Sequence, residues 1–330
     1  MEKTLCYAIL SIKEVNMKTL YIVIPCYNEE EVIDETTKRI RAKVHQLIDK
    51  NDISHESRVL FVDDGSKDRT WEKIQSIHTM DELFVGVKLT RNRGHQNALL
   101  AGLMTAKEYA DIIISMDADL QDDIDAIDGF IEANKEGADI VYGVRKKRDK
   151  DTFFKRFTAE MFYKFMLAMG VDLVYNHADY RLMSKRALDD LEQFGEVNLF
   201  LRGLVPLVGY KSAKVYYERN ERFAGESKYP LKKMLAFAFE GITSFSIKPI
   251  RLILLVSIIM FTISMLIIVY SIYRYMIGAT VSGWAFLNVS IWLIAGVQTL
   301  LLGIVGEYVG KIYNETKHRP RYLIETVLKR

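Results

Sequence analysis

The chain has 330 residues, of which 49% are hydrophobic and 27% are charged, and its formal net charge at pH 7 is +2. These values are typical of a globular protein with one large or two small domains. So small a net charge gives no sign of a nucleic-acid partner. The two cysteines, Cys6 and Cys26, have no metal-ligand spacing and provide no disulfide framework.

The N-terminus does not resemble a secretory leader. Residues 1–16 hold a short apolar run flanked by Lys and Glu, with no small-residue cleavage site. Met17 is followed by a strand-like run. We therefore expect residues 1–16 to be an N-terminal extension and the fold to begin at residue 17.

Short β-branched runs then alternate with helical patterns as far as residue 145. The expected strands are 19–25, 58–64, 83–89, 111–117 and 139–144, and the expected helices are 29–49, 71–78, 95–107 and 124–136. Strand and helix repeated in this way require right-handed crossovers and a mostly parallel sheet with helices on both faces. The sequence predicts a doubly wound α/β fold, in which ligands lie beyond the carboxyl ends of the strands.

A polar cluster follows each of the first four predicted strands. The clusters read PCYNEE, DDGSKDRT, TRNRGHQNA and DADLQDD. Because the carboxyl ends of parallel strands meet at one edge of a sheet, we expect these clusters to form one site. Neither a G-x-G-x-x-G fingerprint nor a P-loop is present. His95 has no partner at ligand spacing, so we expect a polar residue at a helix start rather than a metal ligand.

The fourth cluster concentrates negative charge directly after an apolar run. Asp117 and Asp119 form a D-x-D motif, whose spacing puts both side chains on one side of an extended chain. They could hold Mg²⁺ or Mn²⁺ together with phosphate oxygens. The alternative is an acidic loop in which Asp122 or Asp123 caps the next helix, and this explains one aspartate rather than four.

The ends of the first two strands offer candidates for nucleotide binding. Asp63 and Asp64 could reach a base or a ribose hydroxyl, as acidic residues do beside nucleotides. Tyr27 could stack on a base. Pro25 and Glu29 also have structural explanations, because proline stops a strand and a polar residue there can cap the next helix.

Two long uncharged stretches lie near the C-terminus. Residues 252–273 and 275–306 contain no Asp, Glu, Lys or Arg. A bilayer crossing needs about 20 apolar residues as helix, so the sequence predicts a transmembrane hairpin with helices at about 252–273 and 284–306. Lys and Arg gather outside both spans while the connecting loop carries only Arg274, which predicts that both ends are cytoplasmic.

Ordered segments along the chain carry a resemblance to a known family. VIPCYNEE, FVDDGSKDRT, TRNRGHQNAL and DADLQDD resemble glycosyltransferase family 2 with a GT-A fold. ADYRLMSKRAL, NLFLRGLV, RFAGESKYP and GEYVGKIYNETKHRPRY narrow the resemblance to bacterial polyprenyl-phosphate glycosyltransferases similar to dolichyl-phosphate mannose synthase, with two C-terminal transmembrane helices. The resemblance covers about residues 17–323.

The resemblance implies a domain organisation and roles for particular residues. The domains are the extension 1–16, a cytoplasmic GT-A catalytic domain 17–228, amphipathic interfacial helices 229–250, the hairpin 251–307 and a cytoplasmic tail 308–330. The nucleotide pocket would include Pro25, Tyr27, Glu29, Asp63, Asp64, Asp117 and Gln121. The metal would be held by Asp117, Asp119 and Gln121.

The acceptor side of the implied site is basic. Arg145 and Arg156 would bind a lipid phosphate, and Arg222 and Lys228 would close over the phosphates. The family often has a small hydroxyl residue about one turn after the second arginine, and Thr158 is the residue available here. Asp117, Asp119 and Arg222 would be the catalytic residues.

The activity implied by the resemblance is metal-dependent, inverting transfer of a sugar from a nucleotide sugar to undecaprenyl or another polyprenyl phosphate. UDP-glucose or a UDP-N-acetylhexosamine is the expected donor, at the cytoplasmic leaflet of the cell membrane. A phosphate monoester is mostly a dianion at cytosolic pH and needs no strong general base. Anionic lipids are further expected partners, and relatives suggest a homotetramer.

Two other functions remain open from the sequence. A processive polysaccharide synthase would carry a Q-x-x-R-W acceptor motif and more membrane helices, and no glutamine of this chain begins that motif. A non-catalytic, membrane-anchored scaffold that binds nucleotide sugars would tolerate loss of Asp119 or Arg222, and both are present.

Overall fold

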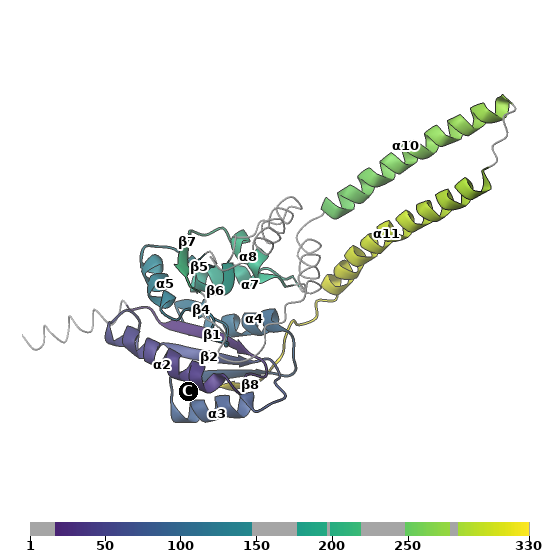
Figure 1. The fold of residues 1–330 in the computed structure, drawn as a ribbon. Coiled ribbons are helices and arrows are strands. Elements are labelled where there is room, and N and C mark those ends of the chain that lie inside the picture. Colours follow the sequence, from purple (N-terminus) through teal and green to yellow (C-terminus); the bar gives the residue numbers. More distant parts are fainter. Residues whose placement is uncertain (1–16, 147–176, 197–198, 219–247, 278–282, 330) are drawn as a thin grey trace, which may run out of the picture. The chain divides into compact units, whose positions relative to one another are not determined.

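The computed structural model describes residues 17–146, 177–196, 199–218, 248–277 and 283–329. The chain divides into two units (Figure 1). One unit consists of Met1–Arg156, Leu173–Lys228 and Pro320–Arg330, and the other of Phe157–Asp172 and Tyr229–Arg319. The predicted extension 1–16 lies outside the described residues.

The first unit is built on an eight-stranded mixed sheet with the order β7-β5-β6-β4-β1-β2-β3-β8. Strands β1, β2, β3 and β4 run parallel, as predicted. Their bounds are Leu20–Cys26, Arg58–Asp63, Phe84–Leu89 and Ile112–Ser115. These strands are almost wholly buried, which explains why they are near-continuous apolar runs rather than alternating ones.

Beyond β4, the sheet does not continue with parallel strands alone. β5 (Ile140–Arg145) does not pair with β4, because β6 (His177–Ser184) lies between them and runs antiparallel to both. β7 (Ser212–Tyr217) then pairs with β5 in parallel. At the opposite side, the C-terminal β8 (Ile324–Leu328) pairs antiparallel with β3. Neither β6 nor β8 was expected from the sequence.

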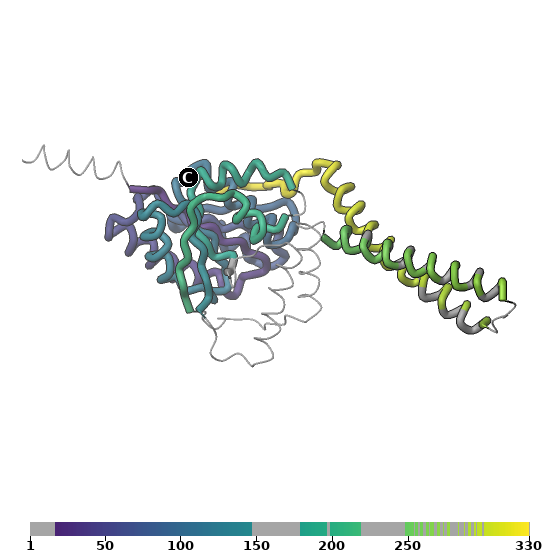
Figure 2. Tube along the Cα trace, turned by 90° about the horizontal axis from the view of Figure 1, so that it is seen from above, coloured from purple at the N-terminus to yellow at the C-terminus, as the bar shows by residue number. Residues whose placement is uncertain are grey.

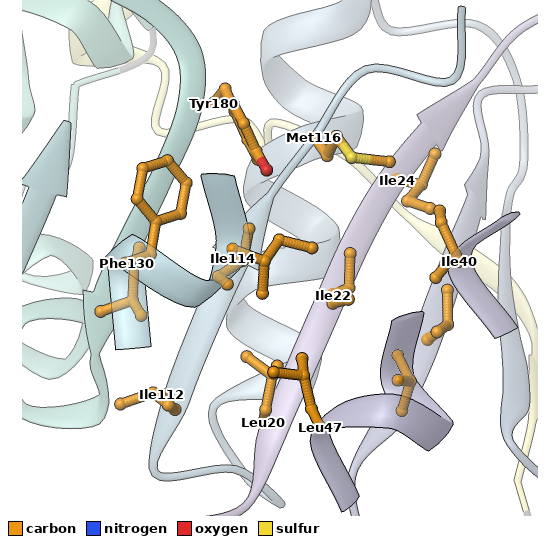
Figure 3. Packing of buried hydrophobic residues seen from close by; sticks show 14 of the residues in the cluster. Leu20, Ile22, Ile24, Ile40, Leu47, Ile112, Ile114, Met116, Phe130 and Tyr180 are labelled. Atoms are coloured by element: carbon orange, nitrogen blue, oxygen red, sulfur yellow. The ribbon is translucent and has the colours of Figure 1, made fainter. Parts of the chain in front are cut away.

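Helices cover both faces of the sheet (Figure 1). Within the described residues of the sheet unit, the helices are α2 (Ile33–Asp49), α3 (Thr70–Met80), α4 (His95–Ala106), α5 (Ala126–Lys135), α7 (Lys185–Glu192) and α8 (Leu201–Leu207). One core cluster joins α2, α3 and α5 to the even-numbered residues of β1, and Figure 3 shows Leu20 beside Leu47 and Ile24 beside Ile40 of α2. The predicted doubly wound arrangement is therefore confirmed.

Helix α4 covers the other face at close range, and Gly102 makes this possible. A Cβ at this position would lie 2.4 Å from Val23 Cγ1 and 2.6 Å from Val62 Cγ2. We expect Gly102→Ala to destabilise the protein by about 1–3 kcal/mol through overpacking, despite the higher helix propensity of alanine. Urea unfolding measures this. Met104→Ala, at a partly exposed position of the same helix, is the control, and equal stability of the two variants would contradict the prediction.

The second unit contains the two helices expected at 252–273 and 284–306. They are α10 (Lys248–Met276) and α11 (Trp284–Thr316), and they run alongside each other in both views (Figures 1 and 2). Among the residues described, none of the helices meets the combined requirement of length and sustained hydropathy for a membrane span. The transmembrane hairpin thus stays a prediction.

Candidate active site

The acidic loop after β4 lies at the carboxyl edge of the sheet, as predicted. The Asp117 side chain is 35% exposed and Asp119 is half-buried, whereas Gln121 and Asp122 are buried. The loop is fixed to α2 because the Thr36 hydroxyl donates to the Ala118 carbonyl over 2.9 Å. The two carboxylates of the D-x-D motif are therefore partly buried on a well-anchored loop.

Asp117 has an unusual electrostatic environment. Burial raises its pKa to about 6; His95 opposes this shift, while the neighbouring carboxylates of Asp122, Asp179 and Asp119 add to it. Several negative charges thus act on one carboxyl group. A bound cation would relieve that repulsion.

Helix capping accounts for at most one aspartate of the acidic loop, as the alternative allowed. Helix α5 begins at Ala126, and Asp125 before it makes no side-chain cap. Asp123 accepts from the backbone N–H of Asp125 at 3.0 Å, in the turn that leads into α5. Asp122 points to other partners: it accepts the Tyr217 hydroxyl proton over 2.5 Å and lies 3.5 Å from Arg145 Nη2.

Arg145 is the one predicted acceptor-phosphate ligand within the described residues, and the structure brings it to the acidic loop. It ends β5, which pairs in register with the end of β7, so that Arg145 lies opposite Tyr217. Its Nε donates to the Tyr217 hydroxyl at 3.2 Å. The predicted residues Arg156, Thr158, Arg222 and Lys228, with most of the interfacial segment 229–250, lie outside the described residues.

Asp63 and Asp64 are buried and hold the neighbouring loops in place. The Asp64 carboxylate accepts from the backbone N–H of Arg93 at 2.7 Å and of Gly94 at 2.9 Å. Asp63 accepts from the backbone N–H of Ser66 at 3.3 Å. Burial raises the pKa of both carboxyl groups, although these hydrogen bonds oppose the shift. Their contacts in the structure are therefore with the protein itself, and a contact with a nucleotide stays a prediction.

The loop after β1 is joined to the segment after β2 by hydrogen bonds from its backbone N–H groups to side-chain hydroxyls. The Asn28 N–H donates to the Ser66 hydroxyl at 3.0 Å, and the Glu29 N–H donates to the Thr70 hydroxyl at 2.9 Å. Helix α2 begins only at Ile33 and has no side-chain cap, so capping does not explain the polar residues of this loop. Pro25 lies within β1, which continues to Cys26 and so does not stop at the proline. Tyr27 follows the strand and is 40% exposed, and its stacking on a base stays a prediction.

A second carboxylate, Asp179, lies next to the D-x-D motif and was not singled out from the sequence. The register of β4 and β6 pairs Ser115 with Arg181, which places Asp179 beside the end of β4. His95, the first residue of α4 as expected, lies between the two: its Nε2 is 3.6 Å from Asp117 Oδ1 and 3.7 Å from Asp179 Oδ2.

Two arginines neutralise Asp179. Arg181 Nη2 lies 2.5 Å and Arg202 Nη2 lies 3.0 Å from its carboxylate oxygens. Burial alone would raise the pKa of Asp179, but Arg202, His95 and Arg181 outweigh it and hold the pKa well below the usual value. The only sequence signal was the alternation of Asp179 and Arg181 in ADYRL, which does not reveal Arg202.

The carboxylate oxygens of Asp117 and Asp119 suit a divalent cation that also binds substrate phosphates. No group of three or more His, Cys, Asp and Glu side chains in the described part of the chain is arranged to hold a metal ion. Mg²⁺ in proteins commonly uses one or two carboxylates and takes its other ligands from water and substrate phosphates. Asp117 and Asp119 fit that pattern.

Comparisons with known proteins agree on the class of enzyme. Residues 21–192 match the family described as glycosyl transferase family 2. An uncharacterised glycosyltransferase of Bacillus subtilis, YkoT, is 53% identical over 93% of this chain and 91% of its own. The bactoprenol glucosyl transferase of Shigella phage SfV is 39% identical over 92% of this chain and 97% of its own.

Similarity to solved structures is more distant. Glucosyl-3-phosphoglycerate synthase from Mycobacterium tuberculosis aligns with 71% of this chain and 80% of its own at 18% identity and a TM-score of 0.45, too remote to inform the site. The family match covers more than half of the chain, and the two sequence relatives align with nearly all of it. The chain belongs to glycosyl transferase family 2.

Proposed function

We propose that this glycosyltransferase transfers a sugar, with inversion, from a nucleotide sugar to undecaprenyl or another polyprenyl phosphate. The relatives named as bactoprenol glucosyl transferases support this acceptor, because they align along more than nine-tenths of both chains. The donor is a UDP-sugar, either UDP-glucose or a UDP-N-acetylhexosamine. The product is a polyprenyl-phosphate-linked monosaccharide for cell-envelope glycosylation.

The observation that carries this proposal is the meeting of opposite charges at one edge of the sheet. The acidic loop supplies Asp117 and Asp119 for the diphosphate side of the donor, and Arg145 reaches the same loop from β5. An arginine suits a phosphate because its planar guanidinium can donate two parallel hydrogen bonds. A site with both features can bring two anionic substrates together.

The metal in this proposal is Mg²⁺ or Mn²⁺, held by Asp117 and Asp119 with Gln121 nearby. When bound, it neutralises negative charge that develops on the departing nucleoside diphosphate. The elevated pKa of Asp117, caused first by burial and then by surrounding carboxylates, is consistent with a place where positive charge is favourable.

The reaction needs little proton transfer. An oxygen of the acceptor phosphate attacks the anomeric carbon, the bond from that carbon to the diphosphate oxygen breaks, and the nucleoside diphosphate leaves with the electron pair. Because the acceptor is already ionised, the rate depends mainly on positioning and on charge stabilisation. The low pKa of Asp179 fits this mechanism, since a carboxylate so stabilised by arginines is a weak base.

Several further parts of the proposal rest on the sequence. Arg156, Thr158, Arg222 and Lys228 complete the acceptor side. The hairpin of α10 and α11 spans the cell membrane, both termini and the catalytic unit are cytoplasmic, and the 229–250 segment lies at the interface, where lipid headgroups are found. The enzyme is a homotetramer in this proposal.

An assay of the purified full-length protein tests the function. With undecaprenyl phosphate and a panel of radiolabelled nucleotide sugars, we expect label to enter the lipid fraction from one UDP-sugar, to be lost with EDTA and to be restored by Mg²⁺ or Mn²⁺. Undecaprenol, which lacks the phosphate, is the matched control and should accept nothing. Transfer to undecaprenol, growth of a polysaccharide, or metal-independent transfer would contradict the proposal.

A further inference from the structure

The Tyr217 hydroxyl joins the acidic loop to Arg145. It donates its single proton to Asp122 Oδ1 at 2.5 Å and accepts from Arg145 Nε at 3.2 Å. Asp122 and Arg145 are themselves 3.5 Å apart, so three side chains from β4's loop, β5 and β7 form a closed triangle. The hydroxyl thus acts as a donor toward one charged group and as an acceptor from the other.

The Tyr217 ring is held rigidly, and this fixes the position of the hydroxyl. The ring packs edge-on against Tyr180, with centroids 5.3 Å apart. Gly143 allows the close approach, because a Cβ there would lie 3.1 Å from Tyr217 Cε1. The Tyr180 hydroxyl in turn donates to the Asp123 carbonyl at 2.9 Å. Two neighbouring tyrosines therefore anchor consecutive residues of the acidic loop.

We propose that Tyr217 is a positioning residue that sets the spacing between the metal-binding carboxylates and Arg145. The inference rests on the proposed function. Asp122 follows Gln121 directly and lies three residues after Asp119, so restraining the Asp122 carboxylate restrains the backbone that carries the metal-binding side chains. The same hydroxyl orients Arg145 toward the loop, where the acceptor phosphate must approach the donor.

The spacing matters for both substrates. If the acidic loop shifts, the carboxylates no longer converge on a cation, and outer partners of metal ligands commonly affect metal affinity by roughly ten- to a hundredfold. If Arg145 loses its hydrogen bond to the Tyr217 hydroxyl, its guanidinium is no longer held in one orientation. The phosphate of the lipid acceptor then binds more weakly. A single hydroxyl group is thus expected to influence metal binding and acceptor binding together.

The adjacent tyrosine provides a matched control. Tyr216 is the preceding residue of β7 and is 59% exposed, whereas Tyr217 is buried. Tyr217→Phe and Tyr216→Phe remove the same atom from neighbouring positions of one strand. We expect Tyr217→Phe to weaken Mn²⁺ binding in the presence of UDP by about tenfold and to raise KM for undecaprenyl phosphate, with Tyr216→Phe unchanged. Electron paramagnetic resonance of free Mn²⁺ measures the first quantity independently of turnover.

A purely structural role predicts a different result. Tyr217→Phe would then lower the unfolding temperature while its Mn²⁺ affinity and its KM matched those of Tyr216→Phe, and this would overturn the inference. Failure of the wild-type protein to bind Mn²⁺ with UDP, or to transfer sugar, would instead overturn the proposed function and the inference with it.

A second variant tests the hydrogen bond between Tyr217 and Asp122 from its other side. It keeps the inference testable if Tyr217→Phe folds poorly. Asp122→Asn keeps the shape of the side chain but removes its charge, and we expect it to weaken Mn²⁺ binding as well. Because the two residues act through one hydrogen bond, the double variant should lose less affinity than the product of the two single losses. Multiplicative losses, or an Asp122→Asn protein with wild-type Mn²⁺ affinity, would overturn the inference.

Discussion

Asp119→Asn is expected to lower sugar transfer on the order of a thousandfold, because the metal's charge stabilisation is worth several kcal/mol in the transition state. Asp119 is half-buried in the loop after β4, and its Oδ1 accepts from the Gln121 N–H at 3.1 Å. Asparagine preserves the shape of the side chain but removes the negative charge that a divalent cation requires. Initial rates at saturating substrates measure the effect.

The control for this variant comes from the same loop. Asp123→Asn changes a carboxylate that accepts from the nearby backbone N–H of Asp125, and the contact of the Asp123 carbonyl with Tyr180 is unaffected. We expect near-normal transfer from Asp123→Asn. An equal loss of transfer rate in both variants would indicate that activity depends on the total charge of the loop. Normal transfer by Asp119→Asn would show that Asp119 is not a metal ligand.

Asp179→Ala is expected to destabilise the protein by about 3–5 kcal/mol, the usual consequence of removing one partner of a buried ion pair. Asp179 is 6% exposed, and its loss leaves the buried Arg181 guanidinium without its carboxylate. Because the pKa of Asp179 is held below its usual value, its contribution is complete above about pH 4 and is lost as the pH falls toward the folded-state pKa. Denaturant unfolding at neutral and acidic pH measures both effects.

An exposed ion pair provides the control, because removing its carboxylate also removes one negative charge but leaves no buried charge without a partner. Asp34 pairs with Lys73 at 2.5 Å, but its side chain is 66% exposed, so Asp34→Ala should cost no more than about 1 kcal/mol. Adding Arg181→Met to Asp179→Ala should recover much of the stability, because the uncompensated buried charge is then removed. Equal stability of Asp179→Ala and Asp34→Ala would contradict the account.

Much of the candidate site was predictable because it depends on local pattern. Apolar runs marked β1 to β4, and the polar clusters after them marked the carboxyl edge of the sheet. The D-x-D motif followed the fourth run directly, so its location needed no knowledge of distant residues. The helix expected at 29–49 likewise corresponds to α2, whose Ile33, Ile40, Val44 and Leu47 are buried against the core.

The remaining features depend on pairings between residues far apart in the chain. The sequence by itself determined the alternation of strands and helices, the position of the acidic loop and the family resemblance, because each depends on residues that are close together in the chain. Only the tertiary structure decided that β6 enters between β4 and β5, that Asp179 thereby lies beside Asp117, and that Tyr217 reaches Asp122. Strand order and register are chosen by burial and hydrogen bonding across the whole sheet, and no local spacing of residues encodes them.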